Sequence, residues 1–267
     1  MDPRWLIRNL ATAWRYSGSV RDFVLAMLWI YSASKRFSGL ADGREWLIGF
    51  RYAPPIGRLR LLLRSNGGSD GFIHGEVFHH EYYSLPLASP PMTILDLGAN
   101  IGLASVYFSR RYPEALLACV EPMPDNLRVL ARNLELNGIE ATVFPAAVDV
   151  EDGRQQMEIT GMDYGHKIAD ATLTRCEGSL EVAALSVSTI LRRLGWERVG
   201  LLKVDIEGHE KNLFSGDCNW LNSVDAMCIE CHGRFGVGDL RDLAGRFGFG
   251  PPTPLPGIWL MTRAGAS

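Results

Sequence analysis

The sequence lacks a long hydrophobic run, which argues against a membrane-spanning helix. Its most apolar stretch, FVLAMLWIY at 23–31, has nine residues, whereas a helix that spans a bilayer needs about 20. The opening segment MDPRWLIRNL has no continuous apolar core of the signal-peptide type. We therefore expect a cytoplasmic protein without a stable membrane span. The arginines around the apolar stretch leave open an amphipathic element that docks on a partner or a membrane surface.

Cysteine and positive charge are also scarce. The five cysteines are scattered, and apart from Cys228 and Cys231 no spacing resembles a zinc or redox motif. This usage fits a reducing compartment better than a disulfide framework. Lys and Arg number 27 against 30 Asp and Glu, so the net charge is −3. That balance argues against a protein that binds nucleic acid through bulk positive charge.

Beyond Pro91 the sequence alternates regularly between strand and helix patterns. Short apolar runs typical of strands lie at 93–98, 115–122, 141–148, 199–208, 224–232 and 257–262. Helical spacing of apolar residues occurs at 101–113, 125–138, 188–196, 209–216 and 239–249. Strands and helices that alternate at short intervals form a parallel sheet with crossover helices. We expect an α/β, Rossmann-like fold with a mostly parallel seven-stranded sheet and helices on both faces.

The first 90 residues follow a different pattern. Residues 3–37 look helical, 46–64 look like a hairpin, 65–71 are rich in turn residues, and 76–85 look helical again. We expect two parts: an N-terminal helical and hairpin extension over 1–90, and a cofactor-binding domain over 91–267. The extension is too short and too aromatic for a typical independent domain. It is predicted to cover the cofactor crevice, to shape the acceptor pocket, or to form a homodimer interface.

The most informative motif is DLGANIG at 96–102. Its glycine spacing is G-x-x-x-G, which departs from the G-x-G-x-x-G of dinucleotide-binding turns. Gly98 permits a close backbone approach, and the leading Asp96 suits a ligand with a cationic amino group. Glu121 ends the next strand, where a carboxylate can accept from both hydroxyls of a ribose. Small residues near Ala147 leave room for an adenine. Together these features indicate S-adenosylmethionine as the cofactor.

The fourth and fifth strands carry the candidate catalytic residues. KVDIEGHE places Asp205 and His209 at one strand end, and IECH places His232 at the next. Neighbouring parallel strands would bring Asp205 and His232 across one crevice. His232 is the first candidate for a general base, because an imidazole titrates near neutrality. Asp205 follows as a base or as an orienting group, and His209 is third.

No metal is expected to be required at this site. A divalent cation held by Asp205, Glu230 and His232 nevertheless remains an open alternative.

In this order, ILDLGANIG, VEPMPDNLRVLARNLELNG, AAVDVEDG, LLKVDIEGHE and IECH resemble the FkbM-type methyltransferases. The resemblance covers about 70–262, and KVDIEGHE is its family-specific element. It implies a class I, S-adenosylmethionine-dependent methyltransferase of the kind often found in bacterial natural-product and glycan pathways. It also implies a hydroxyl acceptor, on a small molecule or a sugar, and no nucleic-acid partner.

The resemblance assigns roles to individual residues. Asp96, Gly98, Asn100 and Gly102 would line the methionine and ribose end, Glu121 would bind the ribose, and Asp205 and Glu207 would stand at the reacting end. Upstream, Ser69, Asp70, Glu81 and Tyr82 match the segment that precedes the cofactor domain in the family and would close over the cofactor. We therefore count Glu81, Ala147 and Asp205 among the cofactor-binding residues. The polar segment 149–180 is expected to form a hairpin and a loop that varies with the substrate.

Three other functions compete with this interpretation. An NAD-dependent oxidoreductase would use the same kind of sheet, but the glycine spacing and the acidic fourth-strand motif disfavour it. A nucleic-acid methyltransferase is disfavoured by the net charge. A non-catalytic cofactor-binding scaffold would act through the aromatic N-terminal section.

Overall fold

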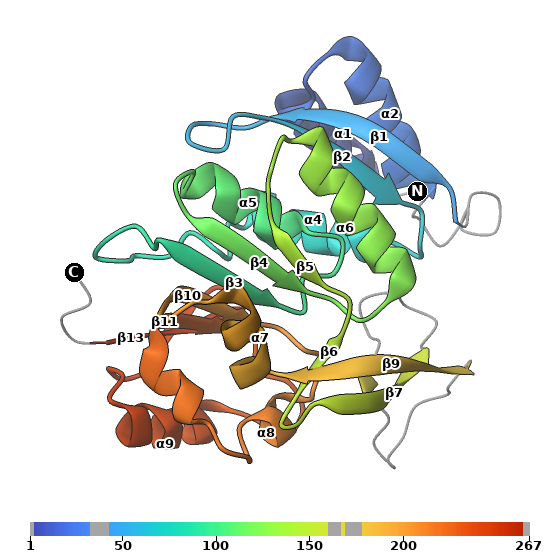
Figure 1. Cartoon of the computed structure of the whole chain (residues 1–267). Coiled ribbons are helices and arrows are strands. Elements are labelled where there is room, and N and C mark those ends of the chain that lie inside the picture. Colours follow the sequence, from blue (N-terminus) through green and yellow to red (C-terminus); the bar gives the residue numbers. More distant parts are fainter. Residues whose placement is uncertain (1–2, 33–42, 160–166, 169–177, 264–267) are drawn as a thin grey trace.

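The computed structural model describes residues 3–32, 43–159, 167–168 and 178–263. Its centre is a seven-stranded sheet (Figure 1). The strands follow the order β12 (Thr253–Leu255), β13 (Ile258–Thr262), β11 (Val224–Ile229), β10 (Val199–Val204), β3 (Thr93–Leu97), β4 (Leu116–Val120) and β5 (Thr142–Phe144). The five strands from β11 to β5 are parallel, and β13 runs antiparallel to both of its neighbours.

The central strands are apolar on both sides because helices cover both faces of the sheet. Helices α5 (Leu103–Arg111) and α6 (Pro124–Leu136) lie above the sheet in Figure 1, and α7 (Val187–Leu194) and α9 (Val237–Phe247) lie below it. Two buried hydrophobic clusters correspond to these two faces. The expected α/β, Rossmann-like fold with a mostly parallel seven-stranded sheet and helices on both faces is confirmed.

Helix ends follow local sequence signals. The Ser186 hydroxyl accepts from the Thr189 backbone N–H at the start of α7, and Gly195 ends that helix with a left-handed φ of 66°. Pro124 occupies the first turn of α6, where its missing N–H costs nothing. The predicted helix at 209–216 is a single turn, α8 (Glu210–Leu213), and a 3-10 turn, η2 (Asn219–Ser223), precedes β11.

Several strand predictions need correction. The single strand expected at 141–148 is divided, because the chain leaves the central sheet at Pro145 and continues as β6 (Ala147–Asp149) in a second sheet. The fourth and fifth strands end earlier than expected, at Val204 and Ile229. The residues of DIEGHE and ECH therefore lie in loops beyond the carboxyl ends of β10 and β11. Strand β12 was not foreseen, since it is short and contains Pro254.

The second sheet has the order β6-β9-β7-β8. Its main feature is the antiparallel pair of β7 (Gly153–Ile159) and β9 (Gly178–Ser186), with β8 (Lys167–Ile168) beside β7. The expected hairpin within 149–180 is thus present. The intervening loop, including His166, lies outside the described residues.

The described residues of the N-terminal section form two helices, a hairpin and a further helical segment. Helices α1 (Pro3–Tyr16) and α2 (Val20–Ser32) precede the antiparallel strands β1 (Glu45–Arg51) and β2 (Arg58–Arg64). The helix expected at 76–85 begins earlier and ends earlier. It forms α4 (Ser69–His74), which continues as a π-helical turn, η1 (Gly75–His79). In the described part of the chain, no helix combines the length and apolarity needed to cross a bilayer.

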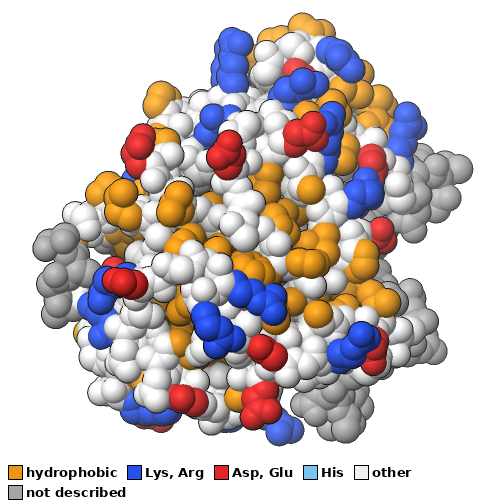
Figure 2. Space-filling model, in the orientation of Figure 1, with side chains coloured by type: hydrophobic (Ala, Val, Ile, Leu, Met, Phe, Trp, Pro, Cys, Tyr) orange, Lys and Arg blue, Asp and Glu red, His pale blue; other side chains and the backbone are white. Residues whose placement is uncertain are grey.

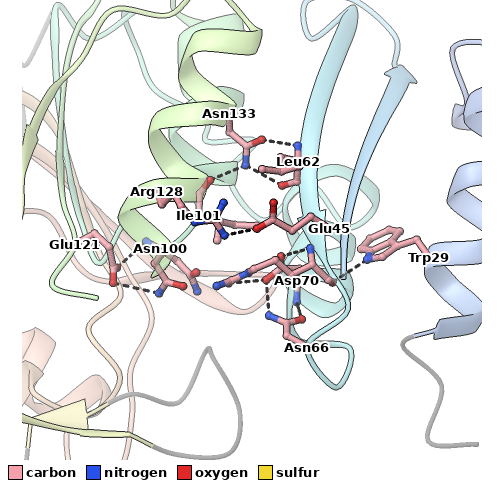
Figure 3. A network of polar contacts seen from close by, with 12 residues as sticks. Trp29, Glu45, Leu62, Asn66, Asp70, Asn100, Ile101, Glu121, Arg128 and Asn133 are labelled. Atoms are coloured by element: carbon pink, nitrogen blue, oxygen red, sulfur yellow. Dashed lines mark hydrogen bonds and ion pairs between the residues drawn. The ribbon is translucent and has the colours of Figure 1, made fainter. Parts of the chain in front are cut away.

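Two asparagines, Asn133 in α6 and Asn137 at its C-cap, connect the hairpin to the elements that pack on the central sheet. The Leu62 N–H donates to Asn133 Oδ1 at 2.7 Å, and Asn133 Nδ2 donates to the carbonyl oxygen of Ile101 at 2.9 Å (Figure 3). Asn137 pairs in the same way with both backbone groups of Arg60. The hairpin also shares a hydrophobic cluster with α5 and α6. Asn133 therefore connects the N-terminal section directly to the glycine-bearing turn.

Candidate active site

A cavity of about 300 Å³ lies beyond the carboxyl ends of β3, β4, β5, β10 and β11. This is where open α/β sheets bind their ligands. The predicted site residues that line it are Gly98, Asn100, Glu121, Ala147, Asp205, Glu207, His209, Glu230 and His232, together with Tyr82. Its wall does not include Asp96, Gly102, Glu81, Ser69 or Asp70. The structure thus brings together residues from five separate strand ends.

Gly98 sits where the glycine turn touches the loop after β10. Its φ is +77°, and a Cβ added there would lie 1.8 Å from the carbonyl oxygen of Asp205. The close backbone approach predicted at Gly98 therefore exists, but the group that approaches is the Asp205 peptide. Two residues later, Asn100 also has a left-handed φ, of 49°. Such a conformation costs a non-glycine residue about 1–2 kcal/mol.

Glu121 is buried and held by three donors. It accepts from the backbone N–H groups of Asn100 and Met123, both at 2.9 Å, and from Asn126 Nδ2 at 3.1 Å. Burial raises the pKa of Glu121, and these hydrogen bonds oppose the increase. Because every one of these donors is uncharged, the carboxylate is oriented without an ion pair. It retains acceptor capacity toward the cavity.

Asp96 does not face the cavity, because it forms an ion pair with Lys203 of β10, the neighbouring strand in the sheet. Its side chain is fully buried, accepts from the Ser105 hydroxyl at 2.6 Å, and lies 3.0 Å from Lys203 Nζ. Lys203 also donates to the carbonyl oxygen of Gly98 at 2.7 Å. Burial alone would lower the pKa of Lys203, but the charge of Asp96 outweighs it and keeps the ammonium charged. The cation beside Asp96 is therefore Lys203, and not the amino group of a ligand as the sequence predicted. Asp96 stabilises the glycine turn through Lys203, which donates to the carbonyl oxygen of Gly98.

Four other residues that were predicted to contact the cofactor lie outside the cavity wall. Gly102 caps α5 with a φ of 81°, and a Cβ there would lie 3.2 Å from Leu130 Cγ. Asp70 forms a buried ion pair with Arg64 at 2.9 Å and so joins α4 to the hairpin. Ser69 is buried beside Asp70, and Glu81 is exposed. The helix that contains Ser69 and Asp70 reaches the cavity through other residues.

His232 lies among carboxylates at the other end of the cavity. Its Nδ1 is 2.8 Å from Glu210 Oε1, and its Nε2 is 3.3 Å from Glu230 Oε1 and 3.9 Å from Glu207 Oε2. Burial would lower the pKa of His232, but the hydrogen bonds to Glu210 and Glu230 raise it to about 11. An imidazole with this pKa is protonated at neutral pH and has no free lone pair. The surroundings of His232 therefore do not suit the general base expected from the sequence.

Two carboxyls of the cavity differ from His232, because their pKa values lie near neutral pH. Burial, followed by the charge of Asp205, raises the pKa of Glu207 to about 8. Burial, followed by the charges of Glu230 and Asp205, raises the pKa of Glu76 to about 7. Glu207 also has a left-handed φ of 53°. Strained non-glycine residues cluster at functional sites, where the surroundings hold them in place.

His209 is bound to one polar partner on the second sheet, Asp149, and to one on α8, Asn212. Its Nε2 lies 3.1 Å from Asp149 Oδ1 and 2.9 Å from Asn212 Nδ2. These contacts connect α8 to β6. His209 therefore has a structural role, because it joins two elements at the cavity wall.

One group of side chains has the spacing needed to hold a cation. Asp205, Glu207 and His232 each offer a potential ligand atom, and these atoms lie within 4.8 Å of one another. Two of the three are the residues named from the sequence, with Glu207 in place of Glu230. The protonated His232 is itself the cation between these carboxylates, and a metal ion would have to displace its proton.

Sequence reasoning missed Glu76, and it did not foresee that the ring of Tyr82 packs against Gly257. Glu76 lies in η1, and a π-helical turn frequently marks a functional site. Tyr82 lines the cavity with its ring against Gly257, where an added Cβ would come within 2.0 Å of the ring. The two acidic residues in GEVFHHEYY were a usable signal, but the sequence pointed to Glu81. Glu76 faces the cavity because of the π-helical turn η1, which the sequence pattern did not predict.

Comparisons with known proteins agree with this geometry. A family model described as the methyltransferase FkbM domain matches residues 96–249. Methyltransferase sdnD of Sordaria araneosa is 34% identical over 179 residues, which cover 54% of this chain and 68% of that protein. The 31-O-demethyl-FK506 methyltransferase FkbM of Streptomyces tacrolimicus is 23% identical over 206 residues, which cover 64% and 79%.

Among solved structures, a methyltransferase FkbM from Methylobacillus flagellatus KT aligns with 96% of this chain and 58% of its own, with 13% identity and a TM-score of 0.46. This chain thus spans a little over half the length of that protein. The family match covers more than half of the present sequence and includes both the glycine turn and the acidic loops after β10 and β11. The chain is a methyltransferase of the FkbM family.

Proposed function

We propose that this methyltransferase uses S-adenosylmethionine and methylates a hydroxyl oxygen of a small molecule or sugar. The observation that carries the proposal is Asn100. Its Oδ1 is buried and has no hydrogen-bond partner among the described residues, and its side chain lines the cavity next to Glu121. An unpaired buried acceptor costs about 1–3 kcal/mol. A ligand with an ammonium or hydroxyl group at this point would satisfy it.

The cavity residues fit the three parts of this cofactor. Glu121 has acceptor capacity for the ribose hydroxyls, and Asn100 offers an acceptor for a polar group next to them. Ala147, Val148 and Met123 form a small apolar wall suited to an adenine ring. The charge at the reacting end is predominantly acidic, which suits a sulfonium. S-Adenosylmethionine supplies an electrophilic methyl group, which an acceptor oxygen must approach in line with the bond to sulfur.

The protein residues at the reacting end then have two tasks. The first is to hold the acceptor hydroxyl, for which Glu76, Asp205 and Tyr82 offer polar groups on three sides of the cavity. The second is to take the hydroxyl proton as the new bond forms. We assign the proton to a carboxylate oxygen of Glu207. Its strained turn directs it into the cavity, and its pKa of about 8 lies near the operating pH.

His232 has a supporting role in this proposal. Its two ring N–H groups donate to Glu210 and Glu230, so the imidazolium orients the carboxylates around Glu207 and balances their charge. Removal of His232 would leave Glu210, which is fully buried, without its cationic partner. His232 is thus a positioning residue.

The name of one relative supports oxygen as the acceptor atom. The Streptomyces protein is a 31-O-demethyl-FK506 methyltransferase, and this name implies an oxygen acceptor for that protein.

Two measurements test the proposal. Calorimetry with S-adenosylmethionine, S-adenosylhomocysteine and NAD should show binding of the first two only. Incubation with methyl-labelled S-adenosylmethionine and pools of hydroxylated small molecules and sugars, read by mass spectrometry, should give products that carry one added methyl group on oxygen. Tight NAD binding without S-adenosylmethionine binding would overturn the cofactor, and methyl transfer to nitrogen or carbon alone would overturn the acceptor.

A further inference from the structure

The charges of this chain are unevenly distributed. Residues 1–64 contain eleven Arg and Lys but four Asp and Glu, so this section carries +7. The remaining chain contains sixteen basic and 26 acidic residues and carries −10. The overall value of −3 conceals this separation. Charge asymmetry of this size between two sections of a chain points to an anionic partner for the basic one.

The same section presents most of the exposed large apolar side chains. On α2, Val20, Val24 and Leu28 are 69%, 49% and 50% exposed. Their spacing of four residues places them along one face of the helix. On α1, Leu10 and Trp14 are 38% and 65% exposed with the same spacing. Figure 2 shows basic and apolar side chains side by side over this section, at the top of the view. We call these five residues the apolar stripe.

Arginines accompany the apolar stripe without side-chain partners of opposite charge. Arg15 and Arg21 are exposed and flank the turn between α1 and α2. That turn lies against β1, because Gly18 N–H donates to the Gly49 carbonyl and Ser17 bridges Phe50. The next residue, Arg51, is directly opposite Arg58 in the hairpin.

Among the described side chains, none of these four arginines has an acidic ion-pair partner. Like charges held opposite each other are unfavourable unless an anionic surface compensates them.

We infer that the α1–α2 face, with its apolar stripe and its unpaired arginines, docks on an anionic lipid surface. An amphipathic helix with Trp and Leu on one side and Arg beside it is the element that lies in a bilayer interface. The described helices are too short and too polar to cross the bilayer, so the contact is peripheral. The inference is independent of the identity of the methyl acceptor.

Two other occupants fit the observations less well. A second copy of the chain in a symmetric dimer would bring one +7 section against another, and the arginines would remain uncompensated. A nucleic acid would neutralise the arginines but would leave the aliphatic side chains of Val20, Val24 and Leu28 in water. An anionic lipid surface would compensate the charge of the arginines and would also bury the side chains of the apolar stripe.

Co-sedimentation with vesicles tests the inference on the full chain. The protein is mixed with phosphatidylcholine vesicles, and with vesicles of phosphatidylcholine and phosphatidylglycerol in roughly a 3:1 ratio, at about 0.1 M and about 0.5 M salt. We expect binding to the anionic vesicles at low salt, and loss of most of that binding at high salt. Binding to neutral vesicles should be weak.

Paired variants separate the contribution of the arginines from that of the apolar stripe. Arg15→Gln with Arg21→Gln should weaken binding about 25-fold, since each arginine near an anionic surface contributes about fivefold. Val20→Ser with Val24→Ser should weaken it about tenfold or more. Matched controls are Arg193→Gln with Arg241→Gln, and Met92→Ser with Leu116→Ser, which alter exposed residues elsewhere. Circular dichroism and cofactor binding should be unchanged in all four.

Several outcomes would overturn the inference. These are absence of binding to anionic vesicles, equal loss of binding in the control variants, or binding that depends on the arginines but not on the stripe and is equally strong on duplex DNA. A dimer in solution that Val20→Ser with Val24→Ser dissociates, without vesicle binding by the wild type, would assign the face to contacts between copies.

Discussion

The two ends of the cavity both contain buried carboxylates, but the groups around them differ. At the cofactor end, Glu121 stands alone and receives three uncharged N–H donors. At the reacting end, Glu207, Asp205, Glu230 and Glu76 face one another, and His232 and Lys203 are the cations among them. The first arrangement fixes one charge in one orientation. The second raises the pKa of Glu207 and Glu76, so that these carboxyls bind and release a proton near neutral pH.

This difference teaches how one edge of a sheet can serve binding and chemistry together. The strand ends are the same kind of position in both cases, and the residue type is the same. What separates their functions is whether backbone amides or other carboxylates are the neighbours. The predictions below alter one end at a time.

The largest effect is expected for Glu207→Gln. The change preserves the shape of the side chain but removes the group that takes the acceptor proton, so methyl transfer should slow by about 10²–10⁴-fold. Single-turnover transfer rates give this value, and calorimetry should show unchanged affinity for S-adenosylhomocysteine. Glu81→Gln is the matched control, because Glu81 also has a left-handed φ but is exposed and outside the cavity. A rate for Glu207→Gln within threefold of wild type would remove Glu207 from the mechanism.

Gly98→Ala should disturb both ends together, since the added Cβ would meet the Asp205 carbonyl and the left-handed φ would be strained. We expect a loss of about 3 kcal/mol or more in the free energy of unfolding, with loss of cofactor binding. Gly138→Ala has a similar φ, of +64°, and open space around it. It should cost only about 1–2 kcal/mol. Urea denaturation compares the two, and equal costs would mean that the Gly98–Asp205 approach is unimportant.

Glu121→Gln should affect the cofactor end alone. Donors reach both oxygens of Glu121, so an amide nitrogen in place of either one leaves a buried N–H without an acceptor. The penalty of about 1–3 kcal/mol corresponds to an affinity for S-adenosylhomocysteine that is about 5- to 150-fold weaker. Glu135→Gln, on the exposed surface of α6, is the control for calorimetry. The pH dependence of transfer at saturating cofactor should remain that of the wild type.

The last expected effect is not on binding or transfer but is a slope of stability with pH. Folding raises the pKa of Glu207 from 4.5 to about 8 and that of Glu76 to about 7, so the folded protein binds these protons more tightly than the unfolded chain. Their contribution to stability is complete below about pH 4.5 and is lost as the pH rises through 7 and 8. The urea concentration at the midpoint of unfolding should therefore decrease as the pH rises from 5.5 to 8.5, while the rate of methyl transfer increases. Glu207→Gln should flatten the slope, and an unchanged slope would contradict the raised pKa.

The sequence predicted the parts of the fold that local pattern controls. The short apolar strands, the glycine at the end of β3 and the capped helices α6 and α7 each carry their own signal, and together they predict a mostly parallel sheet with crossover helices. The pattern at 141–148 was misleading because an apolar run does not show where the chain changes sheets. At 76–85, the apolar spacing did not show that the helix starts at Ser69, within residues that also form turns.

The site was predictable in its residue types but less so in their partners. Glu121, Asn100 and Asp205 reach the cavity as their positions at strand ends imply. Asp96 does not, because its partner Lys203 belongs to the neighbouring strand, and only the register of β3 and β10 brings them face to face. The high pKa of His232 depends on Glu210 in α8, and the position of Tyr82 depends on Gly257 near the end of the chain. Contacts between distant segments decide both.

The central claim is that the carboxylate Glu207, and not the imidazole of His232, exchanges a proton near neutral pH. A titration of the glutamate carboxyl carbons and the histidine ring nitrogens by NMR, assigned with Glu207→Gln, measures both groups in one sample. The account predicts an inflection at about pH 8 for Glu207 and a His232 ring that stays protonated beyond pH 9. A Glu207 carboxyl that titrates near its usual value of about 4.3, together with a His232 ring that loses its proton near pH 6.5, would contradict it.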